Sequence, residues 1–331
     1  MLMRSEADGH SRLHLAVDLE AALDAAANAR LSRRDVPVEL LAPATTASLV
    51  RMAVEEWGMI AALWTAMIFS PWWVSVLLVL PLAGRFHALG VILHDATHMP
   101  LRRKTLGVRF VEALCGFPIA STLNAMRYHH LRHHRDSGMH SDPYYKDGRQ
   151  TASWWTLNTL RGVLLVPFWT LRACVGAVAA VVPAARNVYA HIFLQDKTSL
   201  DLRANREVID CARAEVAQVV FQLGIAAFWL AYPRAVLWGY VIPVTIAGLF
   251  AARRVLIEHT YERTADRQVE TIIATTNDNH LGLLGALGLA PRNIGYHIVH
   301  HIHPQVSLKA LPRLREWYAR SYPELYPAPR R

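Results

Sequence analysis

Two short stretches of the chain are crowded with histidine. Residues 127–136 read RYHHLRHHRD and residues 295–304 read GYHIVHHIHP, and each stretch contains four histidines. A third stretch, HDATH, places His94 and His98 four residues apart. Neutral imidazole is a ligand that suits zinc, copper, iron and nickel, so this concentration of histidines predicts a metal centre.

The spacing inside the stretches favours shared coordination. His130, His133 and His134 stand at positions i, i+3 and i+4, and the same spacing recurs in residues 297–301. On a helix, residues at these intervals lie on one face. Because one zinc ion takes about four ligands, so many histidines indicate two metal ions. The candidate ligands in the three stretches are His94, His98, His130, His133, His134, His297, His300 and His301.

The nearly all-histidine set of ligands limits which class of metal protein the chain can be. The chain has no HExxH motif, which disfavours a zinc membrane protease, and it lacks the Glu-x-x-His pairs of soluble di-iron bundles. A two-metal site built almost entirely of histidine, with an open position, suits iron and oxygen chemistry better than hydrolysis. A membrane metal transporter is the alternative from another class, but it would place histidines and acids at mid-membrane.

The composition indicates that membrane helices position these stretches. Of the 331 residues, 53% are apolar and only 18% are charged, a balance that favours a membrane protein. Four stretches approach the roughly 20 apolar residues that a span requires. Tight turns join the first to the second and the third to the fourth, which predicts an all-α integral membrane fold of two helical hairpins. The four predicted spans are residues 52–69, 72–92, 214–232 and 234–252.

Charge placement orients the hairpins. Basic residues such as Lys104, Arg206 and Arg253 flank the open ends of the hairpins, and the tight turns carry almost none. By the positive-inside rule, both termini and the middle segment are expected to be cytoplasmic, in a bacterial inner membrane. All histidine stretches then face one side as a cytoplasmic helical cap, together with His259, just past the fourth span. These flanking residues account for the net charge of +9 without nucleic-acid binding.

Three further segments are expected to be helical outside the spans. Residues 157–183 are long enough to cross, but they contain Arg161 and Arg172, which are costly at mid-bilayer; an interfacial or re-entrant segment is therefore expected. Residues 107–122 resemble another interfacial helix, and residues 18–35 predict a surface helix. The expected organisation is a cytoplasmic tail (1–47), a membrane-embedded domain (48–318) and a second tail (319–331).

The histidine pattern resembles that of the membrane fatty acid desaturase superfamily, which includes related hydroxylases and carotenoid ketolases. The signature of that superfamily is three boxes, HxxxH, HxxHH and HxxHH, and all three occur here in order at 94–98, 130–134 and 297–301. Residues 293–314 are similar to its NxxxHxxHHxxP ending, and EHT at 258–260 is similar to its additional histidine after the fourth span. The resemblance covers residues 50–315.

The resemblance implies two iron ions, nine histidine ligands and a solvent-linked asparagine. The ninth ligand would be His259, with His280 as the alternative. Asn293, one turn before His297, is the candidate asparagine, and Asn277 is the runner-up. Asp95 and Asp142 are candidate acceptors for the second ring nitrogen of a metal-bound imidazole. His129 and His303 are expected to be structural.

The resemblance also implies an O2-dependent oxidoreductase that desaturates a fatty acyl chain, either of an acyl lipid or of an acyl thioester. A lipid or carotenoid hydroxylase or ketolase on the same scaffold is the alternative, because the histidine boxes bind the metal and do not determine which product forms. No C-x4-C-x2-C run and no GxGxxG motif of a redox domain is present. A separate ferredoxin, rubredoxin or cytochrome with its reductase is therefore expected as the electron donor.

Overall fold

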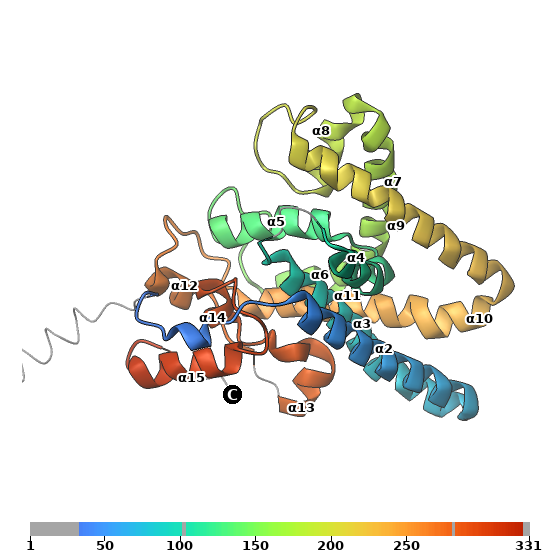
Figure 1. The fold of residues 1–331 in the computed structure, drawn as a ribbon, viewed down its shortest axis with the longest axis horizontal. Coiled ribbons are helices and arrows are strands. Elements are labelled where there is room, and N and C mark those ends of the chain that lie inside the picture. Colours follow the sequence, from blue (N-terminus) through green and yellow to red (C-terminus); the bar gives the residue numbers. More distant parts are fainter. Residues whose placement is uncertain (1–32, 101–103, 280–281, 327–331) are drawn as a thin grey trace, which may run out of the picture. The chain divides into compact units, whose positions relative to one another are not determined.

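The structure is a computed structural model that describes residues 33–100, 104–279 and 282–326 (Figure 1). The chain separates into two units, Met1–Val36 and Pro37–Arg331, and the second unit contains all the elements described below. The predicted surface helix over residues 18–35 lies outside the described residues except for 33–35, which form bends.

Every regular element in the described part of the chain is helical, which confirms that the fold is all-α. Residues 42–43 pair with residues 306–307 through an isolated antiparallel bridge and one backbone hydrogen bond. The longer helices are α2 (Thr46–Phe69), α3 (Trp72–Thr97), α5 (Leu123–Asp136), α6 (Ala152–Leu160), α7 (Leu165–Val181), α9 (Arg206–Ala231), α11 (Ile242–Glu258) and α15 (Leu311–Ser321). The shorter ones are α4 (Leu106–Val111), α8 (Arg186–Val188), α10 (Pro233–Val236), α12 (Val269–Thr275), α13 (Gly282–Leu284) and α14 (His297–Ile302).

Tighter or wider helical turns fill several connections. The 3-10 segments are η1 (Val38–Leu40), η3 (Phe117–Ile119), η4 (Arg161–Leu164), η5 (Pro183–Ala185) and η9 (Pro291–Asn293). The π segments are η2 (Glu112–Gly116), η6 (Tyr189–Phe193), η7 (Leu237–Val241) and η8 (Gly285–Leu289).

Local sequence signals set the limits of the two predicted hairpins. Thr45 caps α2 through a reciprocal capping box with Ser48, and Pro71 separates α2 from α3. Asn205 caps α9 by accepting a hydrogen bond from the backbone N–H of Val208. Pro233 starts the return helix, where its missing N–H has no intrahelical partner to lose. Both hairpins are therefore present, with helices longer than the predicted spans.

Among the residues that the structure describes, five helices are long and apolar enough to cross a membrane, one more than predicted. They are Thr46–Phe69, Trp72–Thr97, Ala152–Val181, Arg206–Ala231 and Pro233–Glu258. The additional one contains the stretch at 157–183, in which a 3-10 turn at 161–164 joins α6 to α7. A sixth possibility is the segment from Leu106 to Asp136, which is bent by 82° between its two helical parts. Of residues 107–122, which were expected to form one helix, residues 107–119 are helical and residues 120–122 are not.

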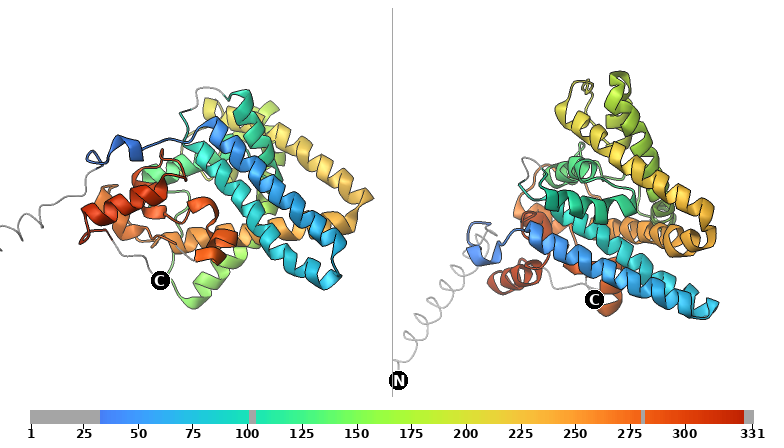
Figure 2. Two further views of the ribbon diagram at one scale, coloured as in Figure 1. Left: turned by 60° about the horizontal axis from the view of Figure 1, so that its bottom comes forward. Right: turned by 45° about the vertical axis from the view of Figure 1, so that its right-hand side comes forward.

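The two hairpins extend toward the same end of their unit. Figures 1 and 2 show the turn between α2 and α3 and the turn between α9 and α10 on one side, with α12, α14 and α15 on the opposite side. α3 packs against α2 and α11, and buried apolar side chains of these helices form the main core. Among them are Leu49, Ile60, Leu82, Phe86, Leu89 and Val244.

An ion pair buried between α7 and α9 explains how this apolar stretch tolerates Arg172. Arg172 Nε lies 2.8 Å from Glu215 Oε1, and neither side chain is exposed. Tyr189 donates a hydrogen bond of 3.1 Å to the same carboxylate oxygen. Arg172 also donates to the backbone carbonyl of Ala120, at 3.3 Å. Arg172 therefore faces protein rather than lipid, because Glu215 balances its charge and its Nε and Nη2 groups donate hydrogen bonds within the protein.

Close backbone contact attaches η8 to α3. A Cβ atom on Gly84 would lie 1.7 Å from the carbonyl oxygen of Leu287. Arg85 donates to the same oxygen at 2.9 Å, and His87 Nδ1 lies 2.7 Å from the carbonyl oxygen of Gly288. The absence of a side chain at position 84 thus lets the segment that precedes the third histidine box lie directly on α3.

Gly84→Ala is expected to destabilise the protein, because the new methyl group would meet backbone rather than a flexible side chain. Overpacking of this kind costs about 1–3 kcal/mol, measurable as a lower midpoint of thermal unfolding in detergent. Gly224→Ala in α9 is the matched control, since a Cβ there meets nothing within 4 Å and alanine favours the helix. Equal midpoints for the two variants would contradict the close contact.

Candidate metal centre

The nine predicted histidines come from four separate segments and lie together. His94 lies in the last turn of α3 and His98 caps that helix. The second box lies on α5, His259 is the C-cap of α11, and the third box forms α14. As predicted, the i, i+3, i+4 spacing turns the histidines of each box toward the others. All nine are buried or half-buried.

Five of these histidines form one group, which we call the five-histidine set. One ring nitrogen from each of them lies within 4.8 Å of every other. His98 Nε2 lies 3.0 Å from His130 Nε2, and His134 Nε2 lies 2.9 Å from the same atom. The ring centroids of His94 and His130 are 4.1 Å apart. The members of the set are His94, His98, His130, His134 and His300.

A second group, the three-histidine set, contains His133, His259 and His301. His133 Nε2 lies 3.0 Å from His259 Nε2, and His301 Nε2 lies 3.4 Å from the same atom. His297 is next to this set, with its Nε2 3.3 Å from His259 Nε2. The two sets adjoin, since the ring centroids of His134 and His301 are 4.3 Å apart.

The donor geometry fits metal ions. Two imidazole nitrogens bound to one ion at about 2.1 Å are at most about 4.2 Å apart, and four of the Nε2 pairs given above are closer than that. Both ring nitrogens of His300 are buried without a hydrogen-bond partner among the described residues. Since buried polar atoms are normally satisfied, these orphaned nitrogens indicate a missing ligand such as a metal ion.

Burial keeps the rings in the neutral, metal-binding form. Burial, followed by the neighbouring His133, lowers the pKa of His259 to about 3. Burial and the charge of Arg127 lower the pKa of His98 to about 3 as well. The pKa values of His297, His300 and His301 also lie well below the ordinary value, first because of burial and then because of neighbouring histidines. At neutral pH each of these rings therefore has a lone pair available for a metal.

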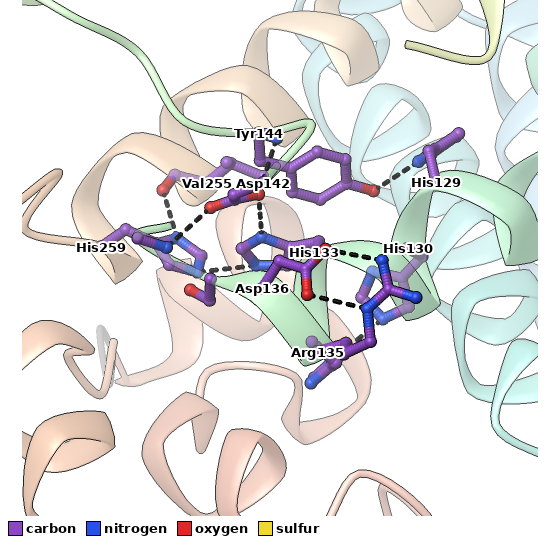
Figure 3. A network of polar contacts seen from close by, with 12 residues as sticks. His129, His130, His133, Arg135, Asp136, Asp142, Tyr144, Val255 and His259 are labelled. Carbon is purple, nitrogen blue, oxygen red and sulfur yellow. Dashed lines mark hydrogen bonds and ion pairs between the residues drawn. The ribbon is translucent and has the colours of Figure 1, made fainter. Parts of the chain in front are cut away.

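Hydrogen bonds orient two rings of the three-histidine set (Figure 3). His133 Nδ1 lies 2.8 Å from Asp142 Oδ1, and His259 Nδ1 donates to the carbonyl oxygen of Val255 at 2.9 Å. A proton on Nδ1 leaves Nε2 free to bind a metal. Burial raises the pKa of Asp142, but the His133 charge and the hydrogen bonds from His133, Gly138 and Tyr144 outweigh it and lower that pKa to about 2. The carboxylate is therefore ionised and able to accept.

Asp142→Ala is expected to weaken metal binding, because His133 would lose the acceptor that fixes its ring. Loss of such a partner typically costs about 10–100-fold in metal affinity or activity. The metal content of the purified variant after dialysis against a graded series of chelator concentrations measures the change. Asp147→Ala is the control, because Asp147 is exposed and pairs with Arg263. Equal metal retention by both variants would contradict the role of Asp142.

Residues around His297 and His301 were not expected from the sequence. Glu258 is fully buried, its Oε2 lies 3.4 Å from His297 Nδ1, and Arg254 pairs with the same oxygen at 2.7 Å. The only hint of this role was that Glu258 directly precedes His259. Arg267 Nη2 lies 3.1 Å from His301 Nδ1. A guanidinium can only donate, so the ring of His301 has an environment different from those of His133 and His259.

The other described site residues that were predicted have hydrogen-bond partners in the backbone. Asp95 is buried and accepts a hydrogen bond from the backbone N–H of Leu308. Asn293 is exposed and donates to the carbonyl oxygen of Leu308 at 3.2 Å, and Asn277 donates to that of Ile257 at 3.2 Å. Within the described ranges, none of these three side chains is hydrogen-bonded to a ring of either set, so their roles at the centre stay predictions. His280 lies outside the described residues.

The two histidines expected to be structural have hydrogen-bond partners away from the sets. His129 Nδ1 lies 2.8 Å from the hydroxyl of Tyr144, and His303 Nε2 lies 2.8 Å from the hydroxyl of Tyr318. Tyr144 was missed by sequence reasoning, although it follows Asp142 by two positions. Its ring stacks on that of His133 with centroids 4.3 Å apart, so it covers one face of the three-histidine set.

A cavity of about 240 Å³ opens beside both sets. Histidines of both sets line it, together with His297, and apolar side chains of α3, α7 and α11 form most of the remaining wall. A cavity of this kind can hold an apolar chain next to bound metals while limiting access of water. The apolar lining includes Phe86, Val91, Leu165, Trp169, Val244 and Ala247.

Comparison with protein families shows to which family the chain belongs. A sequence model described as fatty acid desaturase matches residues 71–331, which include all nine histidines. The chain belongs to the fatty acid desaturase family. A comparison with curated proteins found no significant match. Membership in this desaturase and hydroxylase superfamily confirms the resemblance seen in the three boxes and implies an oxidoreductase with a metal site. It leaves desaturation and hydroxylation undistinguished.

Proposed function

We propose that the chain is a membrane-bound, O2-dependent di-iron oxidoreductase that desaturates a fatty acyl chain. The observation that carries the proposal is that two adjoining histidine sets open onto one apolar cavity. The proposed ligands are the nine predicted histidines, and Asn293 and Asp95 are proposed as supporting residues of the centre. Irons bound by these residues would supply O2 activation and hydrogen abstraction from an unactivated C–H bond, with electrons from a separate donor.

The residues of the chain itself hold the substrate, orient the ligand rings and shield the centre from water. Asp142 and the carbonyl of Val255 fix two rings so that their Nε2 atoms face the centre. The walls of α3, α7 and α11 hold the acyl chain extended beside the histidines and keep bulk water out. Tyr144 closes one side by stacking on His133. The protein thus positions the acyl chain and keeps water away from the centre, and the cofactor would supply the reactivity.

Mass spectrometry of total lipids from a bacterial host that expresses the chain tests this reaction. His133→Ala, in which a proposed ligand is removed, provides the control. A lipid that lacks two hydrogens, absent from the control, supports a desaturase. A lipid that gains one oxygen overturns desaturation in favour of hydroxylation. If neither product appears, the iron content of the purified protein separates a host without the donor or substrate from a wrong assignment.

We further propose four spans in two hairpins, with the histidine boxes and both termini on the cytoplasmic side of a bacterial inner membrane. Support comes from the two hairpin turns, which lie at the end opposite α12, α14 and α15 (Figures 1 and 2). The stretch at 157–183 then lies at the interface, with Arg172 buried against α9. Single cysteines at Ser70 and His140, in a Cys174→Ser background, should be labelled from opposite sides of the membrane. Labelling of both from one side would contradict this topology.

A further inference from the structure

One part of the cavity wall is cationic rather than apolar. Lys146 and Arg161 line the cavity beside the histidines, and the amide side chains of Asn158 and Gln195 line it as well. Arg254 is a third cation on the wall, but Glu258 neutralises it at 2.7 Å. Two cations and two amides thus face a space whose other walls are mainly apolar and histidine.

Neither of the two cations has an acidic partner among the described residues. Lys146 Nζ makes no hydrogen bond or ion pair in this part of the chain, although Lys146 is half-buried. Arg161 Nη1 donates a hydrogen bond to Asn158 Oδ1 at 3.1 Å. The charges that act on Lys146 are two cations, Arg161 and Lys197, against one acid, Asp142.

The acid that acts on Lys146, Asp142, is already engaged. Asp142 Oδ1 accepts from His133 and from the backbone N–H of Tyr144, each at 2.8 Å, and Oδ2 accepts from the backbone N–H of Gly138 at 3.0 Å. Burial, followed by the charges of Arg161 and Lys197, lowers the pKa of Lys146, as expected for a cation whose surroundings are positive. An uncompensated charge at a partly buried site is unfavourable, and an anion placed in the cavity would offset it.

We propose that Lys146 and Arg161 bind the anionic head group of the substrate, a carboxylate or a phosphate, at one end of the cavity. The inference rests on the proposed function, which places an apolar acyl chain in the cavity. It adds that the head group of this acyl chain is anionic. Arg161 keeps N–H groups for a bidentate contact with such a group, and Lys146 adds a point charge. Gln195, held at φ 57°, adds an amide donor. The apolar tail then lies along Phe86, Trp169 and Val244.

This assignment separates two classes of substrate for the same scaffold. An acyl chain with a charged head satisfies both the cations and the apolar wall. A carotenoid or another uncharged hydrocarbon would leave Lys146 and Arg161 without a counter-charge inside the cavity. The structure therefore favours the acyl substrate over the carotenoid alternative on grounds that do not involve the metal.

A binding experiment tests the head group without turnover. The probes are a long-chain fatty acid with two bromines in its chain, the alkyl phosphate of the same chain and the neutral alcohol of the same chain. Bromine quenches tryptophan fluorescence on contact, and Trp169 lines the cavity. Titration of the full chain in detergent gives a dissociation constant for each probe, and a Trp169→Phe variant identifies the signal from the cavity.

Lys146→Gln combined with Arg161→Gln should raise the dissociation constant of the carboxylate or the phosphate about tenfold or more, equivalent to about 1.4 kcal/mol. Binding of the alcohol should stay unchanged. Lys146→Arg should retain tight binding. Lys309→Gln with Arg313→Gln is the matched control, because both residues are exposed on or near α15. A thermal unfolding curve checks that each variant is folded.

The relative effect on the two anions identifies the source of the head group. A larger effect on the carboxylate indicates a free fatty acid, and a larger effect on the phosphate indicates a phospholipid or a phosphorylated carrier. An equal loss for the alcohol, or no loss for either anion, overturns the proposal. Because the readout needs neither iron nor an electron donor, it stands apart from the lipid analysis, which tests the reaction.

Discussion

His259→Ala should remove one of the two proposed irons and abolish product formation. His259 Nε2 lies within 3.4 Å of Nε2 atoms from His133, His297 and His301, so its loss opens the middle of the three-histidine set. The five-histidine set does not include it. We expect iron per chain to fall from about two to about one, and the rate of product formation to fall by about 10³-fold or more, about 4 kcal/mol.

Iron analysis of the purified protein and lipid mass spectrometry of the host measure the two effects. His140→Ala is the control, because His140 is exposed and belongs to neither set. His98→Ala should likewise lower the iron content by about one, since it removes a member of the other set. A His259→Ala protein that retains full iron content would contradict the assignment of His259 as a ligand.

Arg172→Ala should be the most destabilising substitution outside the centre. It leaves Glu215 buried without its counter-charge, and removal of one partner of a buried ion pair costs about 3–5 kcal/mol. The contacts of Arg172 with Ala120 and Ser121, at 3.3 and 3.4 Å, would be lost as well. The free energy of unfolding in detergent, from denaturant titration, measures the effect. Arg213→Ala, on an exposed position of α9, should change it little.

A double variant separates the charge from the packing. Arg172→Met with Glu215→Leu replaces both charges by apolar side chains of similar size, and such replacements are often neutral or stabilising. The double variant should therefore recover most of the stability that Arg172→Ala loses. If it is as unstable as the single variant, the arginine acts through its hydrogen bonds to residues 120–121 rather than through the ion pair.

The sequence was sufficient to predict that the nine histidines meet, because each box has helical spacing and follows or precedes an apolar span. It could not predict how they divide into two sets. His133 and His134 are adjacent in the chain, yet they belong to different sets, since neighbouring residues on a helix point about 100° apart. Which rings approach one another depends on the packing of α3, α5 and α14, which periodicity alone does not specify.

The residues that support the rings were harder to predict for the same reason. Asp142 could be proposed because a carboxylate is a frequent partner of a metal-bound imidazole. Tyr144 and Glu258 depend on tertiary contacts with His133 and His297. The stretch at 157–183 shows a further limit: hydropathy identifies a long apolar helix, but the buried partner of Arg172 lies 43 positions away in the chain.

The third box also bears on the order of events during synthesis. All five candidate spans end by Glu258, whereas His297, His300 and His301 follow them in the chain. A nascent chain that has just completed its last span thus contains five of the nine histidines, with His259 next in the chain. Neither set is complete until α14 has folded against α5 and α12. Under the proposed function, the chain would therefore complete its metal centre only after its last span has been made, and iron would bind in that later step.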